Sequence, residues 1–588
     1  MFARVIARIK GTGASQSTFE VLCREFFAQF FASESVTSDM QLRQAMIGVL
    51  AFILTPGLFV PIQMSASFEM AVLRFPALLE PLTRLMATVY IVYSMVAIGV
   101  IAAVMWDSLA FDRRDAMVLG PLPLSARTIV AAKLTAMGAF LLVTAAGVNV
   151  ITAVLFSMVA GNHKGMFGIV RHFVAHMVTT VSAAAFVFCL LVTVRAIVGG
   201  VAGRRVAISS ILRFLLFSAL LCFIVYVPTA LHVVPGGRRR PTTVYMQPIP
   251  GWSPTNWFLG LYEWIRGSPG SEWEQAALRA VGITTAMVAA AVVMTIAGYR
   301  RQLQLALAPS ASAATHSAAR LPRAIAYLFV ARNRLARATS DFILMTLARS
   351  SAQQVTIAMN AALGLTLIVA SLARTRGDLA LLMRPRTAVL WIPLVLTYWV
   401  AVGLRVSFFV PSELPASWTF RFHAPMRSVA YWSAVRSSAI GFLVPLALVA
   451  DALIAPLIGA RAAAFHAAVV VSVAVLLAET IALTIDFVPF TRPYVPGHAR
   501  LKTRWPLYLL GLFVFAAWPA RLAMRAAGDE AAILQIAGWV LAAAAVLEIA
   551  GRWHASRWQI DPAEEFEEEG SGIAVLDIGM AVHTASRP

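Results

Sequence analysis

The chain has 588 residues, of which 60% are hydrophobic and 13% are charged, and its mean hydropathy is +0.77. A water-soluble fold of this composition would expose apolar surface on every side, so the composition excludes that class and indicates a protein embedded in a bilayer. The formal charge of +20 is spread through loops, which argues against a nucleic-acid-binding face and favours contact with the membrane surface.

Residues 1–45 precede the first apolar stretch and contain an amphipathic pattern. Apolar residues recur there at helical spacing with charged residues between them, which predicts a helix lying on the membrane surface. The apolar positions are Phe19, Leu22, Phe26, Phe27 and Phe30. This region has no apolar core followed by a small-residue cleavage site, so we expect no cleaved signal peptide.

Twelve apolar stretches follow, and each is long enough to cross a bilayer, since roughly 20 residues at about 1.5 Å per residue cover about 30 Å. We place the spans at 46–65, 85–106, 134–160, 173–195, 211–234, 277–298, 356–373, 387–409, 438–459, 462–483, 506–524 and 531–550. The expected fold class is therefore an all-α polytopic membrane protein with about twelve transmembrane helices.

A linker of small residues, Ala308 to Ala319, divides the spans into two sets of six. Because six is even, both sets enter the membrane in the same direction, which predicts two parallel six-helix pseudo-repeats. The expected regions are a cytoplasmic N-terminal part (1–45), a first membrane half (46–299), a cytoplasmic linker with a second surface helix (300–355), a second membrane half (356–550) and an acidic cytoplasmic tail (551–588).

Basic residues predict the orientation. Most of the 48 Lys and Arg residues fall in loops that are cytoplasmic if both termini are cytoplasmic, as the positive-inside rule requires. Arg238, Arg239 and Arg240 are the exception, because this orientation places their loop outside. We therefore expect a multi-pass protein of the bacterial inner membrane with cytoplasmic N- and C-termini.

The loop between the second and third spans, residues 106–133, is called the coupling segment here. Its apolar residues fit one side of a short helix, and its charged residues would keep the other side in water. The apolar residues are Phe111, Met117, Val118 and Leu119, and the charged residues are Asp112, Arg113, Arg114 and Asp115. Pro121 and Pro123 end this helix, and Ser125 is a suitable N-cap for the next. The first turns of that next helix, with Arg127 and Lys133, are expected to extend into water.

This pattern resembles the cytoplasmic coupling segment of membrane subunits of type 2 ABC exporters. The matching residues are Phe111, Asp112, Arg113, Arg114, Asp115, Leu122, Pro123, Ser125, Arg127 and Lys133. Such subunits are similar in having six spans per half, a surface helix before the first span and an external helical insertion before the sixth. The candidate insertion here is the aromatic stretch Trp252 to Trp264. The likeness covers most of residues 15–300.

The second half carries a matching segment with fewer of these features. Its residues are Trp418, Phe420, Arg421, Pro425 and Arg436. The paired aspartates are missing and no long insertion precedes the twelfth span, so the second half resembles a diverged copy of the first.

The resemblance implies transport driven by another chain. The sequence contains no Gly-x-x-x-x-Gly-Lys-Ser/Thr motif and no soluble stretch long enough for a nucleotide-binding domain, so we expect a non-catalytic chain without a cofactor of its own. The family resemblance implies a separate ABC ATPase subunit that dimerises beneath both halves and binds ATP and Mg. The substrate would be hydrophobic or amphipathic, since the predicted spans are rich in Ala, Val, Leu and Phe.

Four polar residues inside the predicted spans are further candidates. A carboxylate near a helix centre costs about 3 kcal/mol, so Asp451 and Glu479 are expected to face the bundle interior, to pair, or to be protonated. They leave open a rival function, an ion-coupled secondary transporter. Asn149 and Asn360 are expected to hydrogen-bond between helices as packing contacts.

His172 and His176 share one helix face, as two metal ligands must, but no carboxylate or cysteine stands near them in the sequence. We expect a water-facing pair at the membrane interface. Cys23, Cys189 and Cys222 lack metal-site spacing, so neither a metal nor a disulfide is expected. A third class, a polytopic enzyme of lipid or glycan assembly, would need a carboxylate or histidine cluster at a membrane face, and none is evident.

Overall fold

In the computed structural model of the chain, the residues that the structure describes are almost entirely helical. It describes residues 17–30, 79–106, 108–111, 113–202, 214–219, 231–234, 243–246, 251–307, 319–330, 332–373, 387–410, 429–485, 487–491, 501–526 and 528–557, with a few single residues and pairs between 62 and 76 and at 212 and 222. Most of the predicted span at 46–65, the three consecutive arginines at 238–240 and all of the acidic tail after residue 557 lie outside these residues, because α22 continues to Arg557.

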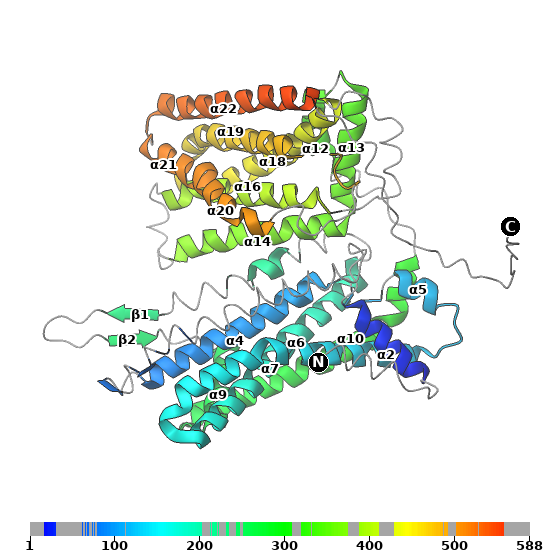
Figure 1. Cartoon of the computed structure of the whole chain (residues 1–588), viewed down its shortest axis with the longest axis vertical. Coiled ribbons are helices and arrows are strands. Elements are labelled where there is room, and N and C mark those ends of the chain that lie inside the picture. The colour runs from blue at the N-terminus through cyan, green and yellow to red at the C-terminus, as the bar shows by residue number, and fades with distance from the viewer. Residues whose placement is uncertain are drawn as a thin grey trace, which may run out of the picture.

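The first half of the chain forms a bundle around four long helices (Figure 1). These are α4 (Leu79–Val104), α6 (Ala126–Gly161), α7 (Gly165–Ala202) and α10 (Ser271–Leu307), with the short turn η2 (Asn162–Lys164) joining α6 to α7. Three shorter helices pack on them: α2 (Thr18–Gln29) on α6, α5 (Arg113–Leu119) on α10, and α9 (Pro254–Arg266) on α4, α7 and α10.

The second half forms another bundle. Its long helices are α14 (Ser351–Ala373), α16 (Thr387–Ser407), α18 (Val429–Ile458), α19 (Ala460–Thr484) and α22 (Glu530–Arg557). The segments α20 (Leu501–Leu512), η4 (Phe513–Ala517) and α21 (Trp518–Arg525) follow one another as a further helical rod, in which η4 is π-helical. Two shorter helices, α12 (Arg320–Val330) and α13 (Arg334–Arg349), pack on α18, and Figure 1 shows α13 crossing the ends of the bundle helices.

The described residues contain nine stretches long and apolar enough to cross a membrane. The longest, 126–198, contains both α6 and α7, so the described residues contain ten helical segments long enough to cross. They coincide with ten of the twelve predicted spans. Many of their side chains toward the outside of the bundles are apolar and exposed, as lipid contact requires. The chain is therefore an all-α polytopic membrane protein.

The fifth predicted span, 211–234, ends differently from the prediction. Its last residues form strand β1 (Leu231–Val234), which pairs antiparallel with β2 (Thr243–Met246). The prediction of a helix was wrong for these residues because an apolar run alone does not distinguish a helix from a strand. The β-branched pair Val233 and Val234 and the following Pro235 favour a strand that leads into a turn.

Helix packing follows the same scheme in the two bundles. The second, third and sixth predicted spans of each set contact the fourth, which gives the contacts of α4, α6 and α10 with α7 and those of α16, α18 and α22 with α19. In each bundle the short helix before the spans packs on the third span, α2 on α6 and α12 with α13 on α18.

Each bundle has its own apolar core, and a small cluster joins them. Ala103 of α4, Phe217 and Ala362 of α14 are almost fully buried against one another. Within the second bundle, α12 approaches α18 closely, since a Cβ atom on Gly441 would lie 2.3 Å from the carbonyl oxygen of Pro322. Glycine is therefore required where these two helices meet.

Candidate functional site

Lys133 is the last residue of the coupling segment, and its side chain is 1% exposed. Its Nζ donates a hydrogen bond to Gln29 Oε1 of α2 at 2.9 Å and lies 3.5 Å from Asp115 Oδ2 of α5. The ammonium also lies 4.7 Å from the ring centre of Phe26 and 5.5 Å from that of Phe111, within the range of cation–π attraction. One side chain of α6 therefore connects α2 and α5.

The prediction that Lys133 and Asp115 lie in water was wrong. Both are buried, because each neutralises the other and α2 covers the pair, with Gln29 donating a further hydrogen bond to Asp115 Oδ1 at 3.2 Å. Phe111 is also buried, and its ring centre lies 4.8 Å from that of Tyr299 near the end of α10. The coupling segment is thus held by three helices of the bundle.

The described part of the coupling segment exposes several apolar side chains. Met117 is 51% exposed, Val118 63% and Leu122 46%, whereas Ala116 and Asp115 of the same helix are buried. The prediction that the charged residues of this helix face water was therefore wrong for Asp115, which is buried. Exposed aliphatic side chains gathered on a short helix and the turn after it are typical of a surface that another molecule covers.

The remaining residues of the coupling segment are placed in part. Ser125 is the N-cap of α6 as predicted, since its hydroxyl accepts a hydrogen bond from the Thr128 N–H at 3.1 Å. Pro123 and Arg127 are exposed. Asp112 and the side chains of Arg113 and Arg114 lie outside the described residues.

Arg436 lies inside α18 rather than in a loop, because that helix begins well before the apolar stretch used to predict it. Its Nε donates to Glu479 Oε1 of α19 at 2.5 Å, and its Nη2 lies 3.0 Å from Glu548 Oε2 of α22. The guanidinium also lies 5.3 Å from the ring centre of Phe329 in α12. The other residues of the second segment, Trp418, Phe420, Arg421 and Pro425, lie outside the described residues.

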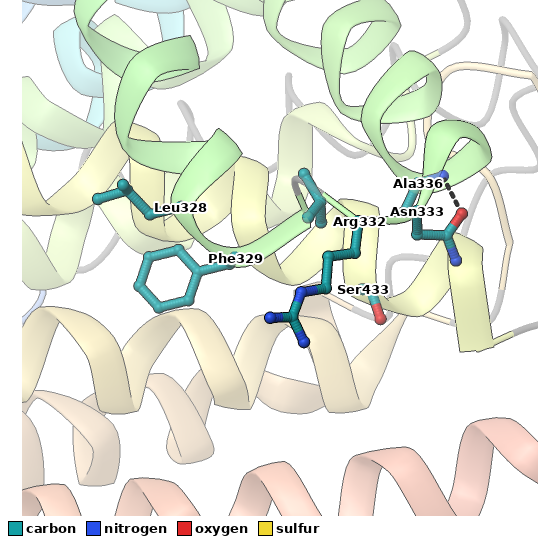
Figure 2. A pocket seen from close by; sticks show the side chains of 7 residues that line it. Leu328, Phe329, Arg332, Asn333, Ala336 and Ser433 are labelled. Carbon is teal, nitrogen blue, oxygen red and sulfur yellow. Dashed lines mark hydrogen bonds between the residues drawn. The ribbon is translucent and has the colours of Figure 1, made fainter.

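A hollow of about 340 Å³ opens where α12 turns into α13 (Figure 2). It is lined by Leu328, Phe329, Val330, Arg332, Asn333, Ala336 and Ser433. Asn333 is the N-cap of α13, and its Oδ1 accepts a hydrogen bond from the Ala336 N–H at 3.1 Å. Apolar and cationic side chains therefore share one open site next to α18.

The two intramembrane carboxylates are paired, as one of the stated alternatives predicts. Asp451 lies 2.5 Å from His466 Nδ1, and both side chains are almost fully buried. Gly459, with φ +89°, forms the turn between α18 and α19, so residues at similar distances before and after it come together. Sequence reasoning missed His466, although this symmetry about the turn was the available signal. Glu479 pairs with Arg436.

The two asparagines differ in their contacts. Asn149 is buried and donates to Ser94 Oγ of α4 at 2.9 Å, which makes it an interhelical packing contact as predicted. Asn360 donates at 2.9 Å to the carbonyl of Thr356 in its own helix, and its Cβ packs closely against Gly403 of α16. The amide of Asn360 therefore supports α14 rather than joining it to a neighbour.

The prediction of a water-facing histidine pair was wrong. His172 and His176 are 2% and 1% exposed, because α9 lies over this end of the bundle. His172 Nδ1 lies 2.6 Å from the hydroxyl of Tyr262, and His176 Nε2 lies 3.0 Å from Thr152 Oγ1. Among the described residues, no three His, Cys, Asp or Glu side chains are close enough to hold a metal.

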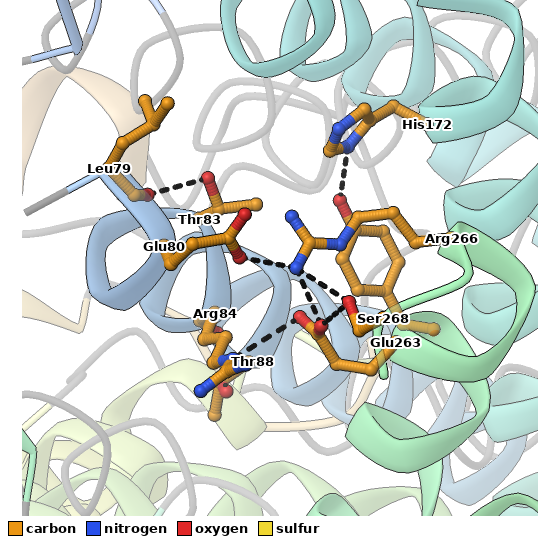
Figure 3. Close-up of polar contacts among 10 residues, drawn as sticks. Leu79, Glu80, Thr83, Arg84, Thr88, His172, Glu263, Arg266 and Ser268 are labelled. Atoms are coloured by element: carbon orange, nitrogen blue, oxygen red, sulfur yellow. Dashed lines mark hydrogen bonds and ion pairs between the residues drawn. The ribbon is translucent and has the colours of Figure 1, made fainter. Parts of the chain in front are cut away.

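Helix α9 overlaps the predicted insertion and extends two residues beyond it, and ion pairs hold this helix to the bundle (Figure 3). Glu263 is 0% exposed and accepts a hydrogen bond from Arg266 Nη2 at 2.6 Å, while Arg84 Nε of α4 lies 3.6 Å away. Arg266 also donates to Glu80 at the start of α4. Two cations and two carboxylates thus compensate one another, and Ser268 completes the group by donating to Glu263.

Replacing Tyr262 by Phe is expected to destabilise the first bundle by about 1–3 kcal/mol, because it leaves His172 Nδ1 buried without its hydrogen-bond partner. Burial raises the pKa of the Tyr262 hydroxyl, so this group stays protonated at all physiological pH values. Thermal unfolding of the full chain in detergent measures the change. Tyr299→Phe is the control, since the ring contact with Phe111 remains; an equal loss in both variants would contradict the prediction.

The described arrangement can transmit movement between helices, because most of its buried charges form ion pairs from one helix to another and few face an open site. Its exposed apolar groups lie on the coupling segment and on α12, where they can be covered by a partner or by lipid. Comparison of the chain with protein-family models, with curated proteins and with solved structures found no match.

Proposed function

We propose that the chain is the membrane-spanning subunit of an ATP-driven ABC exporter and that a separate ATPase chain supplies the energy. The observation that carries this proposal is the anchoring of the coupling segment by Lys133. Force applied to the exposed side of α5 would reach α2 through Gln29 and α6 through Lys133 itself. A flexible loop could not transmit such a force, because it would deform first.

The shared packing scheme supports a second part of the proposal, that the chain consists of two parallel six-span pseudo-repeats. Lys133 and Arg436 are each the eighth residue of the helix that forms the third span of their half. Each is buried in an ion pair and lies near an aromatic ring of the surface helix, Phe26 in the first half and Phe329 in the second. Equivalent cations at equivalent positions favour a duplication.

In the proposed cycle, the partner ATPase binds ATP and Mg as a dimer, and nucleotide-driven closure moves the coupling segment. The two halves then rock about a central path for a hydrophobic or amphipathic substrate. The motor shifts this equilibrium only by its difference in affinity for the two states of the coupling segment. We place the chain in the bacterial inner membrane with both termini in the cytoplasm, as the positive-inside distribution favours.

The exposed residues of the coupling segment provide the test. Replacing Met117 and Val118 together by Asp is expected to weaken co-purification of the ATPase at least ten-fold, because two charges would be buried against the partner. The co-purified chain is identified by its P-loop sequence in mass spectrometry and by ATP hydrolysis. Arg127→Gln, an exposed polar change in the same segment, is expected to leave the complex intact. Equal recovery of an ATPase with both variants would exclude this surface as the docking site.

The buried pair of Asp451 and His466 favours a second candidate, an ion-coupled secondary transporter. A carboxylate hydrogen-bonded to an imidazole inside a membrane domain can exchange a proton during a cycle. Glu479 is a weaker candidate for this role because Arg436 already neutralises it. Transport that persists without any ATPase but is lost in Asp451→Asn would support this candidate and overturn the ATP-driven one.

A further inference from the structure

We propose that the hollow between α12 and α13 binds the phosphate group of an anionic phospholipid, with an acyl chain lying along α12. This inference is independent of the energy source for transport. Figure 2 shows Arg332 between Phe329 and Ser433, so the hollow has an apolar wall, a cation and a hydroxyl side by side. A phospholipid carries the complementary groups in the same order, hydrocarbon next to phosphate.

The apolar part of the site is a stripe on α12. Leu321, Leu328 and Phe329 are 59%, 79% and 46% exposed, and their spacing of seven and eight residues places them on one helix face. The opposite face is buried on α18, through Ala326 and Val330. The stripe is therefore free to contact an acyl chain.

The direction of α12 places the polar part of the site at headgroup level. Pro322, near the start of α12, lies against Gly441 of α18, whereas the hollow at the end of α12 includes Ser433. These two positions of α18 are separated by about 12 Å, since a helix rises about 1.5 Å per residue. Ser433 is nearer the end of α18 that carries Arg436, and Gly441 is nearer its apolar interior. A lipid lying on α12 would thus have its tail toward Leu321 and its phosphate toward Arg332.

The arginines of residues 320–349 favour a lipid with a negatively charged headgroup. Residues 320–349 contain six arginines and one acidic residue, Asp341, which Arg323 already engages with Nε 2.8 Å from Oδ1. The other five arginines are exposed, and they are Arg320, Arg332, Arg334, Arg337 and Arg349. A zwitterionic headgroup would bring its own cation into this field, whereas phosphatidylglycerol adds a net negative charge.

The test is a lipid titration of the full chain in neutral detergent, with bound lipid counted by native mass spectrometry. Dioleoyl-phosphatidylglycerol is expected to bind at least ten-fold more tightly than dioleoyl-phosphatidylcholine. Arg332→Gln should weaken the first phosphatidylglycerol binding event about five-fold, as expected for losing one cation near an anionic surface. Phe329→Ser should weaken both lipids, because it removes apolar contact from the tail.

Arg349→Gln is the matched control, since Arg349 is exposed at the opposite end of α13 from the hollow. It should change binding less than two-fold. Equal effects of Arg332→Gln and Arg349→Gln would overturn the site in favour of diffuse attraction. Displacement of phosphatidylglycerol by inorganic phosphate at an equal concentration would overturn the lipid as occupant. Unchanged thermal unfolding of Arg332→Gln confirms that its effect is on binding, since this side chain is exposed.

Discussion

Replacing Arg436 by Met is expected to lower the free energy of unfolding of the chain by about 3–5 kcal/mol. This is the largest effect on stability among the substitutions proposed here. The substitution leaves Glu479, which is 1% exposed, without its cation inside the second bundle. Glu548 of α22 loses the same partner, so contacts of α18 with both α19 and α22 weaken together. Thermal or denaturant unfolding of the full chain in detergent measures the loss.

The matched control is the double variant Arg436→Met with Glu479→Leu. Because an apolar pair of similar volume carries no uncompensated charge, this double variant is expected to recover most of the stability lost in the single variant. If the double variant were as unstable as Arg436→Met, packing of the arginine stem rather than the ion pair would be responsible.

Replacing Lys133 by Met is expected to release the coupling segment while leaving the bundle folded. Asp115 and Gln29 would lose their shared donor, and hydrogen bonds to charged groups contribute about 1.5–3 kcal/mol. Backbone amides of α5 and α2 should then exchange hydrogen roughly 10- to 100-fold faster, which is the rate change that about 1.4–2.7 kcal/mol of local stability produces. Hydrogen exchange followed by mass spectrometry gives this result for each helix separately.

The control variant Lys164→Met tests whether the loss of a lysine elsewhere in the chain also speeds hydrogen exchange in α2 and α5. Lys164 is exposed in the turn η2, at the opposite end of α6, and contacts neither α2 nor α5. Exchange in those helices should be unchanged in this variant. Faster hydrogen exchange throughout the chain in Lys133→Met would indicate that Lys133 stabilises the whole fold. That result would contradict its proposed role in anchoring the coupling segment.

Most helices and their order could be predicted from the sequence because a long apolar run is most stable as a helix in a bilayer. Backbone groups in hydrocarbon must be hydrogen-bonded within the segment, so ten predicted spans coincide with described helices. The helix around Phe26 and the N-cap at Ser125 were also predicted correctly, because both depend on neighbouring residues only.

The burial of charged side chains could not be predicted from the sequence in the same way. Whether Lys133 or Asp115 lies in water depends on α2 folding over them, and α2 belongs to a segment about a hundred positions away from Lys133. The partners of Arg436 likewise come from two later helices, and His172 is covered by α9. Periodicity describes one helix at a time, whereas these contacts depend on which helices meet.

The junction between the two bundles has a mechanical consequence. Ala103, Phe217 and Ala362 bear no charge and no side-chain hydrogen-bonding group, so sliding these three residues past one another exchanges similar dispersion contacts and meets little resistance. Inside a bundle, by contrast, moving α19 against α18 must separate Arg436 from Glu479. We therefore expect the two bundles to move past each other by shear at this apolar cluster, with each bundle moving as a rigid body.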